Sequence, residues 1–319
     1  MGAFLLRRLL ALAATLFGAS LVIFLVMEVL PGDPAAVILG TGAREDTLAA
    51  LRAQMGLDLP AHARFLGWWG EILTGSLGVS HTYGSPVTEL VGERIGVTVP
   101  LAIMAILLST AIAIPAGVFA AARHNTAADA GVMGLAQLGV AVPNFWFAML
   151  LILVFAVWLG WVPAGGFAGW DKGWQAAVVS LLLPALALAL PQAAILARVT
   201  RSSVLETMGE DYVRTARARG LTRVQALWRH AVRNALIPVV TIMGLQFSFL
   251  LVGTIIIENV FYLPGVGRLM FQAIAQRDLI VVQSLLLIMV AAVVTVNFAV
   301  DVAYVLLDPR LRLRGRGDG

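Results

Sequence analysis

Carboxylates close to long apolar stretches are candidates for binding a polar substrate or relaying a proton. This sequence has three, Glu28, Glu258 and Asp301, with Asn259 and Asn297 as polar neighbours. Each acid lies within about two turns of the end of its stretch, where water or lipid headgroups can solvate the charge. A charge there costs much less than the roughly 3 kcal/mol expected at a helix centre. We therefore expect interfacial or helix-packing roles rather than a proton relay.

Proline inside an apolar stretch breaks or kinks a helix, and such kinks often lie beside a cavity. Pro143 is one of four such prolines, with Pro115, Pro184 and Pro191. We place Pro143, Glu258, Asn259, Asn297 and Asp301 together as candidates for a gate or pathway. A kink without a function is the alternative for each proline.

The sequence lacks the residue patterns of common catalytic and metal sites. It has no cysteine, and its four histidines are far apart in the chain. No Gly-x-x-x-x-Gly-Lys-Ser/Thr phosphate cradle is present, since the single lysine, Lys172, has no such context. We expect no metal site, no cofactor and no enzymatic activity in this chain.

The composition indicates an integral membrane protein. Of the 319 residues, 60% are hydrophobic and only 13% are charged, against about 25% charged in soluble domains. A bilayer core needs about 20 apolar residues of helix, and six segments satisfy this requirement. They are Leu9–Leu30, Val99–Ala122, Ala130–Gly160, Ala176–Ala197, Ala235–Ile257 and Leu279–Leu307. The prediction is an all-α protein with six transmembrane helices.

The basic residues predict the orientation of these helices. With a cytoplasmic N-terminus, fifteen of the 22 basic residues fall on the inside and seven on the outside. Cytoplasmic loops carry the excess of Lys and Arg, so both termini are expected in the cytoplasm. The basic pI therefore reflects membrane orientation, and no nucleic-acid partner is expected.

A long internal loop, residues 198–234, carries the clearest local signals. Apolar residues recur there at helical spacing, with arginines between them. Gly220 interrupts the run as a left-handed cap does, and Thr222 stands three residues before Gln225 in a capping box. The pattern predicts helix, sharp turn and helix. It leaves open an amphipathic helix on anionic lipid or a helix docked into a protein partner.

The residues from Asp211 to Leu221 (DYVRTARARGL), followed by Arg229 to Pro238 (RHAVRNALIP), resemble the cytoplasmic coupling loop of the dipeptide/oligopeptide/nickel family of ATP-binding cassette importers. They resemble its B-type membrane subunit in particular. Further similar motifs follow in order along essentially the whole chain: Arg7-Arg8-Leu9, Leu30–Pro34, Gly56-Leu57-Asp58, Gly75–Gly78, Val142–Trp146, Leu159–Pro163, Glu258–Phe261, Pro264–Arg268 and Asp308-Pro309-Arg310.

The resemblance implies which residues couple the chain to an ATPase. The family motif often begins Glu-Ala-Ala, whereas Arg214-Thr215-Ala216 stands here, and Gly220 keeps the family-like turn. The implied coupling helix sits in a groove of the ATPase, where small residues permit close approach and arginines pair with acidic groups. The residues implied in this contact are Arg214, Thr215, Ala216, Arg217, Gly220 and Leu221.

The resemblance also implies the assembly. A type-1 importer permease would form half of a pathway with a second homologous permease subunit, in the bacterial inner membrane. Two ATP-binding subunits would hold ATP and magnesium, and an extracytoplasmic binding protein would deliver di- or oligopeptides. Glutathione, nickel chelates and oligosaccharides are alternative cargoes, and an ion-coupled secondary transporter or a non-conducting scaffold or sensor are alternatives of other classes.

The expected organisation has four parts. Residues 1–32 form an N-terminal transmembrane helix, and residues 33–97 form an extracytoplasmic region with helical patterning around Leu48–Met55 and Phe65–Leu73. Residues 98–308 form the core of five helices with its coupling loop, and residues 309–319 form a cytoplasmic tail.

Overall fold

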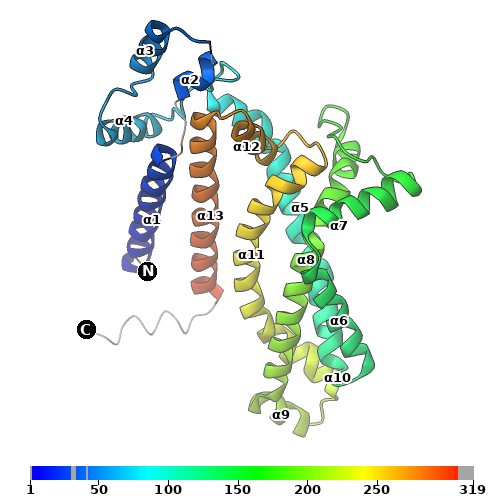
Figure 1. Cartoon of the computed structure of the whole chain (residues 1–319). Coiled ribbons are helices and arrows are strands. Elements are labelled where there is room, and N and C mark those ends of the chain that lie inside the picture. The colour runs from blue at the N-terminus through cyan, green and yellow to red at the C-terminus, as the bar shows by residue number, and fades with distance from the viewer. Residues whose placement is uncertain (1, 30–33, 41, 308–319) are drawn as a thin grey trace. The chain divides into compact units, whose positions relative to one another are not determined.

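The computed structural model describes residues 2–29, 34–40 and 42–307, and their regular structure is helical apart from one isolated bridge between Val79 and Pro86 (Figure 1). Five single helices are long and apolar enough to cross a membrane, and two more helices that meet at a bend make a sixth span if they are counted together. The predicted all-α membrane architecture is confirmed. The five single helices long and apolar enough to cross a membrane are Leu6–Val29, Val87–Ala122, Trp174–Gly209, Arg223–Val260 and Leu279–Val302.

The chain divides into two compact units, and each is described by itself. The first consists of Met1–Thr98 and Pro264–Thr295, and the second of Val99–Leu263 and Val296–Gly319. The first unit contains α1 (Gly2–Val29), α2 (Pro34–Leu39), α3 (Glu45–Gln54), α4 (Ala61–Leu73), the start of α5 (Val87–Ala122), α12 (Val266–Ala275) and most of α13 (Leu279–Leu307).

In the first unit, aromatic side chains hold α4 against α1. The buried ring of Phe65 lies edge-on to Phe17 and Phe24, with ring centroids 5.8 and 5.3 Å apart. The indole Nε1 of Trp69 donates a hydrogen bond to Ser20 Oγ at 2.9 Å. The helical patterning predicted near residues 48–55 and 65–73 is confirmed by α3 and α4.

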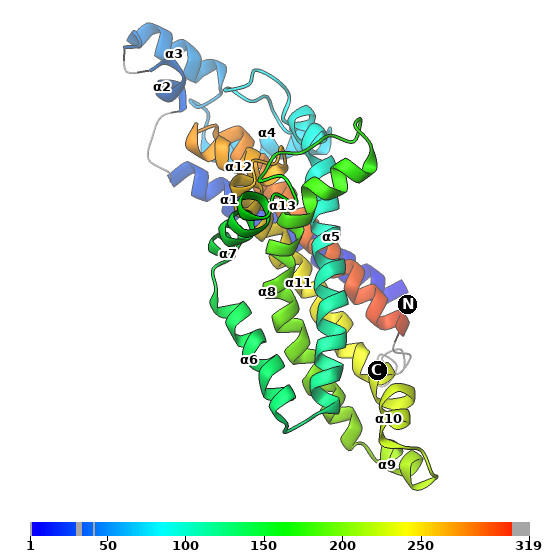
Figure 2. The same ribbon diagram turned by 90° about the vertical axis from the view of Figure 1, so that its right-hand side faces the viewer.

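The second unit is built around α8. Its elements are the rest of α5, α6 (Ala127–Ala141), α7 (Asn144–Leu151), the π-helical turn η1 (Ile152–Trp158), α8 (Trp174–Gly209), α9 (Asp211–Ala218), α10 (Arg223–Ala226), the π-helical turn η2 (Leu227–Ala231), α11 (Val232–Val260) and the end of α13. Helix α8 is the most buried of the spans and packs against α6, α7 and α11 (Figure 2).

Small residues let α5 approach α8 closely. Gly117 of α5 lies so near α8 that a Cβ at this position would be 2.5 Å from the carbonyl oxygen of Ala197 and 2.6 Å from Thr200 Cβ. Only glycine fits at this crossing without a shift of one helix. The many alanines of α8, including Ala193 and Ala197, are buried on the same principle of close backbone approach.

The third predicted span differs from the expectation of one helix over residues 130–160. It is α6 and α7–η1, whose axes are bent by 104°. Val142 is extended, with φ −87° and ψ 126°, and it directly precedes Pro143. Proline disfavours the helical conformation of the residue before it, and it has no N–H to donate. In contrast, Pro184 and Pro191 lie inside α8, which continues through them.

Other helix bounds also extend beyond the apolar stretches from which they were predicted. Helix α5 begins at Val87 rather than Val99, and α8 continues to Gly209 rather than ending near Ala197. The extensions contain polar residues such as Arg94 and Arg201, because helices continue past the bilayer core into more polar surroundings. Of the predicted motifs, Pro31-Gly32-Asp33, the end of the first span at Leu30, Asp308-Pro309-Arg310 and the tail 309–319 lie outside the described residues.

Candidate coupling site

The predicted coupling segment, residues 211–226, begins where α8 ends. Glu210 has extended dihedral angles, φ −68° and ψ 146°, which stop α8 and start α9 in a new direction. Helix α9 is only 8 residues long, and its one buried side chain is Val213, which has 0% exposure. A short helix that buries a single apolar residue presents most of its surface to a partner or to solvent.

The predicted turn at Gly220 is confirmed as a helix C-cap. Gly220 has φ +100°, a backbone conformation that residues other than glycine rarely adopt. Its N–H donates to the carbonyl of Arg217 at 3.0 Å, and the N–H of Leu221 donates to the carbonyl of Ala216 at 3.3 Å. This pair of bonds is the Schellman arrangement, in which two carbonyls of the last turn are satisfied.

The predicted capping box at the start of α10 is also confirmed. The N–H of Gln225 donates to Thr222 Oγ1 at 3.3 Å, and the N–H of Thr222 donates to Gln225 Oε1 at 3.0 Å. The turn between α9 and α10 is therefore fixed at both ends by its own residues.

A buried cluster connects this segment to the spans. Leu227 and Ala231 of η2 pack with Val204 of α8 and with Val118 of α5. The amide Nδ2 of Asn234 in α11 donates to the hydroxyl of Tyr212 in α9 at 2.7 Å. Figure 1 shows α9 and α10 together at the same end of this unit. The turn η2 is therefore packed on α8 and α5, and α9 is joined to α11 by a direct hydrogen bond.

The residues implied in coupling lie on the accessible part of this segment. Ala216 and Leu221 are half-buried, whereas Arg214, Thr215, Arg217 and Gly220 are exposed. Arg214 makes an exposed ion pair with Asp211, at 3.5 Å, and Thr215 Oγ1 donates to the carbonyl of Asp211 at 2.9 Å. The exposed guanidinium groups of Arg214 and Arg217 are thus available to an acidic partner surface.

The gate and pathway candidates lie in different surroundings. Pro143 is exposed and caps α7, whereas Asn259, Asn297 and Asp301 are half-buried. Glu258 has 0% exposure, so the expectation that water or headgroups solvate it is wrong. Beyond Glu258 the chain turns back at Phe261 and Leu263, both buried, and the N–H of Leu263 donates to the Glu258 carbonyl at 2.9 Å.

A loop from elsewhere in the second unit packs against the same turn. The N–H of Gly166 donates to the carbonyl of Phe261 at 2.8 Å, and a Cβ on Gly165 would lie 2.6 Å from that oxygen. The position of Glu258 near the end of its apolar stretch suggested solvation. Nothing in the sequence indicated that this loop packs on the turn after Glu258, because the loop lies almost 100 residues earlier in the chain.

One ion pair of this unit was not predicted. Asp129, in the first turn of α6 and 4% exposed, accepts from Arg201 Nε at 2.6 Å and from Arg201 Nη2 at 2.7 Å. The N–H of Asn125 also donates to Asp129, at 3.1 Å, and His124 Nδ1 lies 3.4 Å from the same carboxylate. The pair was missed because Arg201 looked like one of many loop arginines in the sequence and because 72 residues separate it from Asp129.

Metal binding has no support in the described ranges. Within residues 2–29, 34–40 and 42–307, no three His, Cys, Asp or Glu side chains are grouped so that they could hold an ion.

Two family models match the chain. Residues 113–313 match the binding-protein-dependent transport system inner membrane component, and residues 1–102 match the N-terminal part of such membrane components. The chain belongs to this family. This permease is 42% identical over 315 residues to a putative peptide transport system permease protein of Brucella abortus, which covers 98% of this chain and 99% of the relative.

Other relatives are similar over the same length. A probable peptide ABC transporter permease protein of Sinorhizobium fredii is 37% identical, covering 98% of this chain and 100% of that protein. The glutathione transport system permease protein GsiC of Escherichia coli is 38% identical, covering 98% and 99%.

Solved structures confirm the type-1 importer permease fold. The inward-facing MetNI methionine ABC transporter matches with a TM-score of 0.57 over 69% of this chain and 97% of that chain, at 18% identity. A second crystal form of the same transporter matches with a TM-score of 0.54 over 69% and 96%, at 16% identity. At this identity the likeness concerns the fold alone.

The family defines the broad role of the molecule. It is a multi-pass membrane permease subunit of an ATP-binding cassette importer, and family membership implies the bacterial inner membrane. Membership also implies that the permease works with an ATPase and a substrate-binding protein.

Proposed function

We propose that this permease forms half of a translocation pathway for di- or oligopeptides and is driven by separate ATPase subunits through residues 198–234. The observation that carries the proposal is the segment α9–Gly220–α10, which is exposed, capped on both sides of its turn and packed onto the spans. Peptide cargo is supported by the printed names of the relatives from Brucella and Sinorhizobium.

The coupling contact would use one face of this segment. Ala216 and Gly220 would allow close approach of the ATPase groove, and Leu221 would pack at its edge. Arg214 and Arg217 would pair with acidic groups, and Thr215 would lie beside them. Because the Schellman turn and the capping box stiffen the segment, ATPase closure would move α9 as one body and rock α8 and α11.

We further propose that this chain lies in membrane lipid and works in an assembly with three kinds of partner subunit. A second, homologous permease subunit would complete the pathway, two ATPases would hold ATP and magnesium, and a binding protein would dock on the extracytoplasmic side. This chain would be non-catalytic, with both termini in the cytoplasm, and it would bind no nucleic acid.

The organisation that fits this role has an N-terminal helix at 1–32 and an extracytoplasmic region at 33–97. The core at 98–308 holds five helices and the coupling loop, followed by the tail at 309–319. Pro143, Glu258, Asn259, Asn297 and Asp301 remain the proposed gate or pathway residues. The burial of Glu258 favours a packing role for its carboxylate over direct contact with cargo.

Glutathione is the second candidate cargo, because GsiC is 38% identical over nearly the whole chain. Nickel chelates, oligosaccharides and an ion-coupled mechanism have no observation in their favour here. Uptake that collapses when an uncoupler is added at constant ATP would support an ion-coupled mechanism instead.

The test uses the complete transporter in proteoliposomes, with a labelled tripeptide and its binding protein outside. Ala216→Trp and Gly220→Pro should abolish ATP-driven uptake and release the ATPase on purification, while the permease still inserts. Ala61→Trp places the same bulk on the exposed surface of α4 and should retain both. Normal uptake with bound ATPase in Ala216→Trp and Gly220→Pro would refute the coupling role, and glutathione uptake in place of tripeptide uptake would change the cargo.

A further inference from the structure

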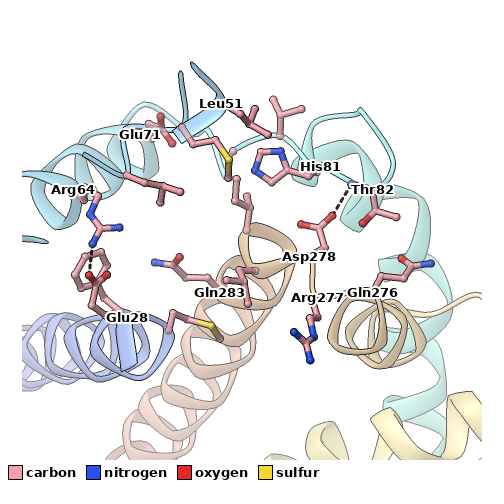
Figure 3. Close-up of a pocket in the computed structure, with 18 of the residues that line it drawn as sticks. Glu28, Leu51, Arg64, Glu71, His81, Thr82, Gln276, Arg277, Asp278 and Gln283 are labelled. Carbon is pink, nitrogen blue, oxygen red and sulfur yellow. Dashed lines mark hydrogen bonds and ion pairs between the residues drawn. The ribbon is translucent and has the colours of Figure 1, made fainter. Parts of the chain in front are cut away.

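The first unit holds a cavity of about 720 Å³ between α1, α4 and α13 (Figure 3). On one side Arg64 is ion-paired with Glu28. On the other, Asp278 accepts hydrogen bonds from Ser80 Oγ at 2.5 Å and from the N–H of Thr82 at 3.1 Å. These contacts hold the walls together and do not define a ligand. The surface that does point to a partner is apolar and lies in the second unit.

That surface belongs to α7 and η1, which follow one another without a break. Their residues, 144–158, include no charged side chain and, apart from Asn144, are all hydrophobic. A helix that is hydrophobic on all sides is buried in protein or in a membrane. Here α7 packs against α8 and α11 and buries Ala148 and Leu151, whereas no residue of η1 is buried. The exposed face of α7–η1 consists of residues four positions apart: Phe145, Met149, Leu153 and Val157.

The bend before α7 leaves backbone groups that need polar surroundings. The last carbonyls of one helix and the first N–H groups of the next have no partner in their own helices. Pro143 caps α7 without a side-chain hydrogen bond, and Ala141, Pro143 and Phe145 are exposed. Irregular backbone that faces lipid does not occur within the hydrocarbon core. The bend therefore lies near headgroups or water.

The helix lengths agree with this position. If α6 and α7–η1 formed one span, Pro143 would lie halfway along it, at the middle of the bilayer. Helix α6 alone has 15 residues and covers about 22 Å of a core that is about 30 Å thick. It therefore ends about 8 Å from the far boundary, and a helix that lies along an interface is buried by about 5–10 Å. With α6 close to the membrane normal, the bend of 104° leaves α7–η1 close to the membrane plane.

Tryptophans mark the end of this helix and the loop after it. Trp158 ends η1 and is 72% exposed, and Trp161, Trp170 and Trp174 are exposed as well. Tryptophan is enriched at the level of the lipid headgroups, where the ring meets both apolar and polar surroundings. The chain thus stays at the interface from the bend to the start of α8.

We propose that α6 makes the third crossing by itself and that α7–η1 lies in the outer interface of the bilayer, with its exposed face in the lipid acyl chains. The number of crossings remains six, and the partner of this face is lipid. Because α7 packs on α8 and α11, the helix anchors in the bilayer the end of this unit that lies opposite α9 and α10 (Figure 1). That the leaflet is the outer one rests on the orientation proposed above.

The test measures the depth of nitroxide labels by power saturation with oxygen and with a water-soluble nickel chelate. The full chain is placed in phosphatidylglycerol nanodiscs, and each label is attached to a single cysteine, since the chain has none of its own. The labelled variants are Phe145→Cys, Met149→Cys, Leu153→Cys and Val157→Cys. All four should favour oxygen and lie within about 8 Å of one depth. In a span the depth would change steadily by about 18 Å from residue 145 to residue 157, and a steady change above 8 Å would overturn the proposal.

Helix α6 provides the matched control. Ala130 and Leu138 are both exposed and eight positions apart, so labels on Ala130→Cys and Leu138→Cys should differ in depth by about 12 Å. Equal depths at these two positions would also overturn the proposal, because α6 would then not cross the bilayer. So would labels on the exposed face of α7–η1 that favour the nickel chelate, because that face would then lie in water.

A second measurement distinguishes lipid from a partner protein. In the complete transporter, the label on Val157→Cys should keep the oxygen accessibility and mobility that it has in the chain alone. Loss of both on assembly would assign the face to another subunit and overturn the proposal. Neither measurement depends on transport, so a permease that moves no tripeptide can still confirm the interfacial helix. Labels at the depths of a span in an active transporter refute this inference alone.

Discussion

The carboxylate of Asp129 and the guanidinium of Arg201 form a two-pronged ion pair between the start of α6 and α8, with N–O distances of 2.6 and 2.7 Å. Arg201 lies two turns before α8 ends and α9 begins. The pair therefore fastens the bent third span to the helix that leads into the coupling segment. His124 and the N–H of Asn125 complete the ring of partners around the carboxylate.

Removing Arg201 should destabilise the second unit more than removing an exposed arginine. Arg201→Ala leaves Asp129 buried without its main partner, and we expect the melting temperature in detergent to fall by roughly 3 °C or more. Arg201→Lys should be intermediate, because lysine cannot donate the same two parallel bonds. Arg214→Ala is the matched control, since its pair with Asp211 is exposed on both sides. Equal melting of Arg201→Ala and the unaltered chain would show that the pair contributes nothing.

The turn at Gly220 offers a test of backbone conformation without a change in packing. No atom lies within 4 Å of a Cβ built on Gly220, so Gly220→Ala acts only through its φ of +100°. Such a conformation costs alanine roughly 1–2 kcal/mol. We expect faster amide hydrogen exchange in α9 and less ATPase retained on purification.

Gly209→Ala is the control for that change. Gly209 ends α8 with the same open space around it, but it has no positive φ, so alanine should leave exchange in α9 unchanged. If both variants behaved alike, the left-handed cap would not be what orders the segment.

The turn of the coupling segment was predictable because its signals are local. A glycine cap and a capping box act on residues three to five positions apart, so Gly220, Thr222 and Gln225 encode the turn by themselves. The spans were predictable for a similar reason, since each apolar stretch is by itself long enough to cross the bilayer core as a helix.

The features that were missed depend on contacts between distant residues. Asp129 meets Arg201 across 72 positions, and the loop at Gly165 and Gly166 covers the turn after Glu258. The effect of a proline is equally dependent on its surroundings. Pro143 accompanies a bend of 104°, whereas Pro184 lies inside a continuous helix that is packed on several sides.

The crossing of α5 and α8 predicts opposite effects for one substitution at two glycines. In an open helix, Gly→Ala stabilises by about 0.5–1 kcal/mol. Gly134 of α6 has no atom within 4 Å of its Cβ position, so Gly134→Ala should be neutral or stabilising. Gly117→Ala places a Cβ 2.5 Å from the Ala197 carbonyl oxygen and should destabilise by about 1–3 kcal/mol, as overpacking does. Thermal unfolding of the two variants side by side measures the difference, and a stabilised Gly117→Ala would mean that the helices separate easily.

The orientation can be tested cleanly because the chain has no cysteine. Ala218 ends α9 and Ala61 begins α4, and both side chains are exposed. Because cytoplasmic loops carry the excess of Lys and Arg, we expect Ala218→Cys to react with an impermeant maleimide only in inverted vesicles. Ala61→Cys should react only in intact cells whose outer membrane has been made permeable. The opposite pattern would place the coupling segment outside, where no ATPase could reach it.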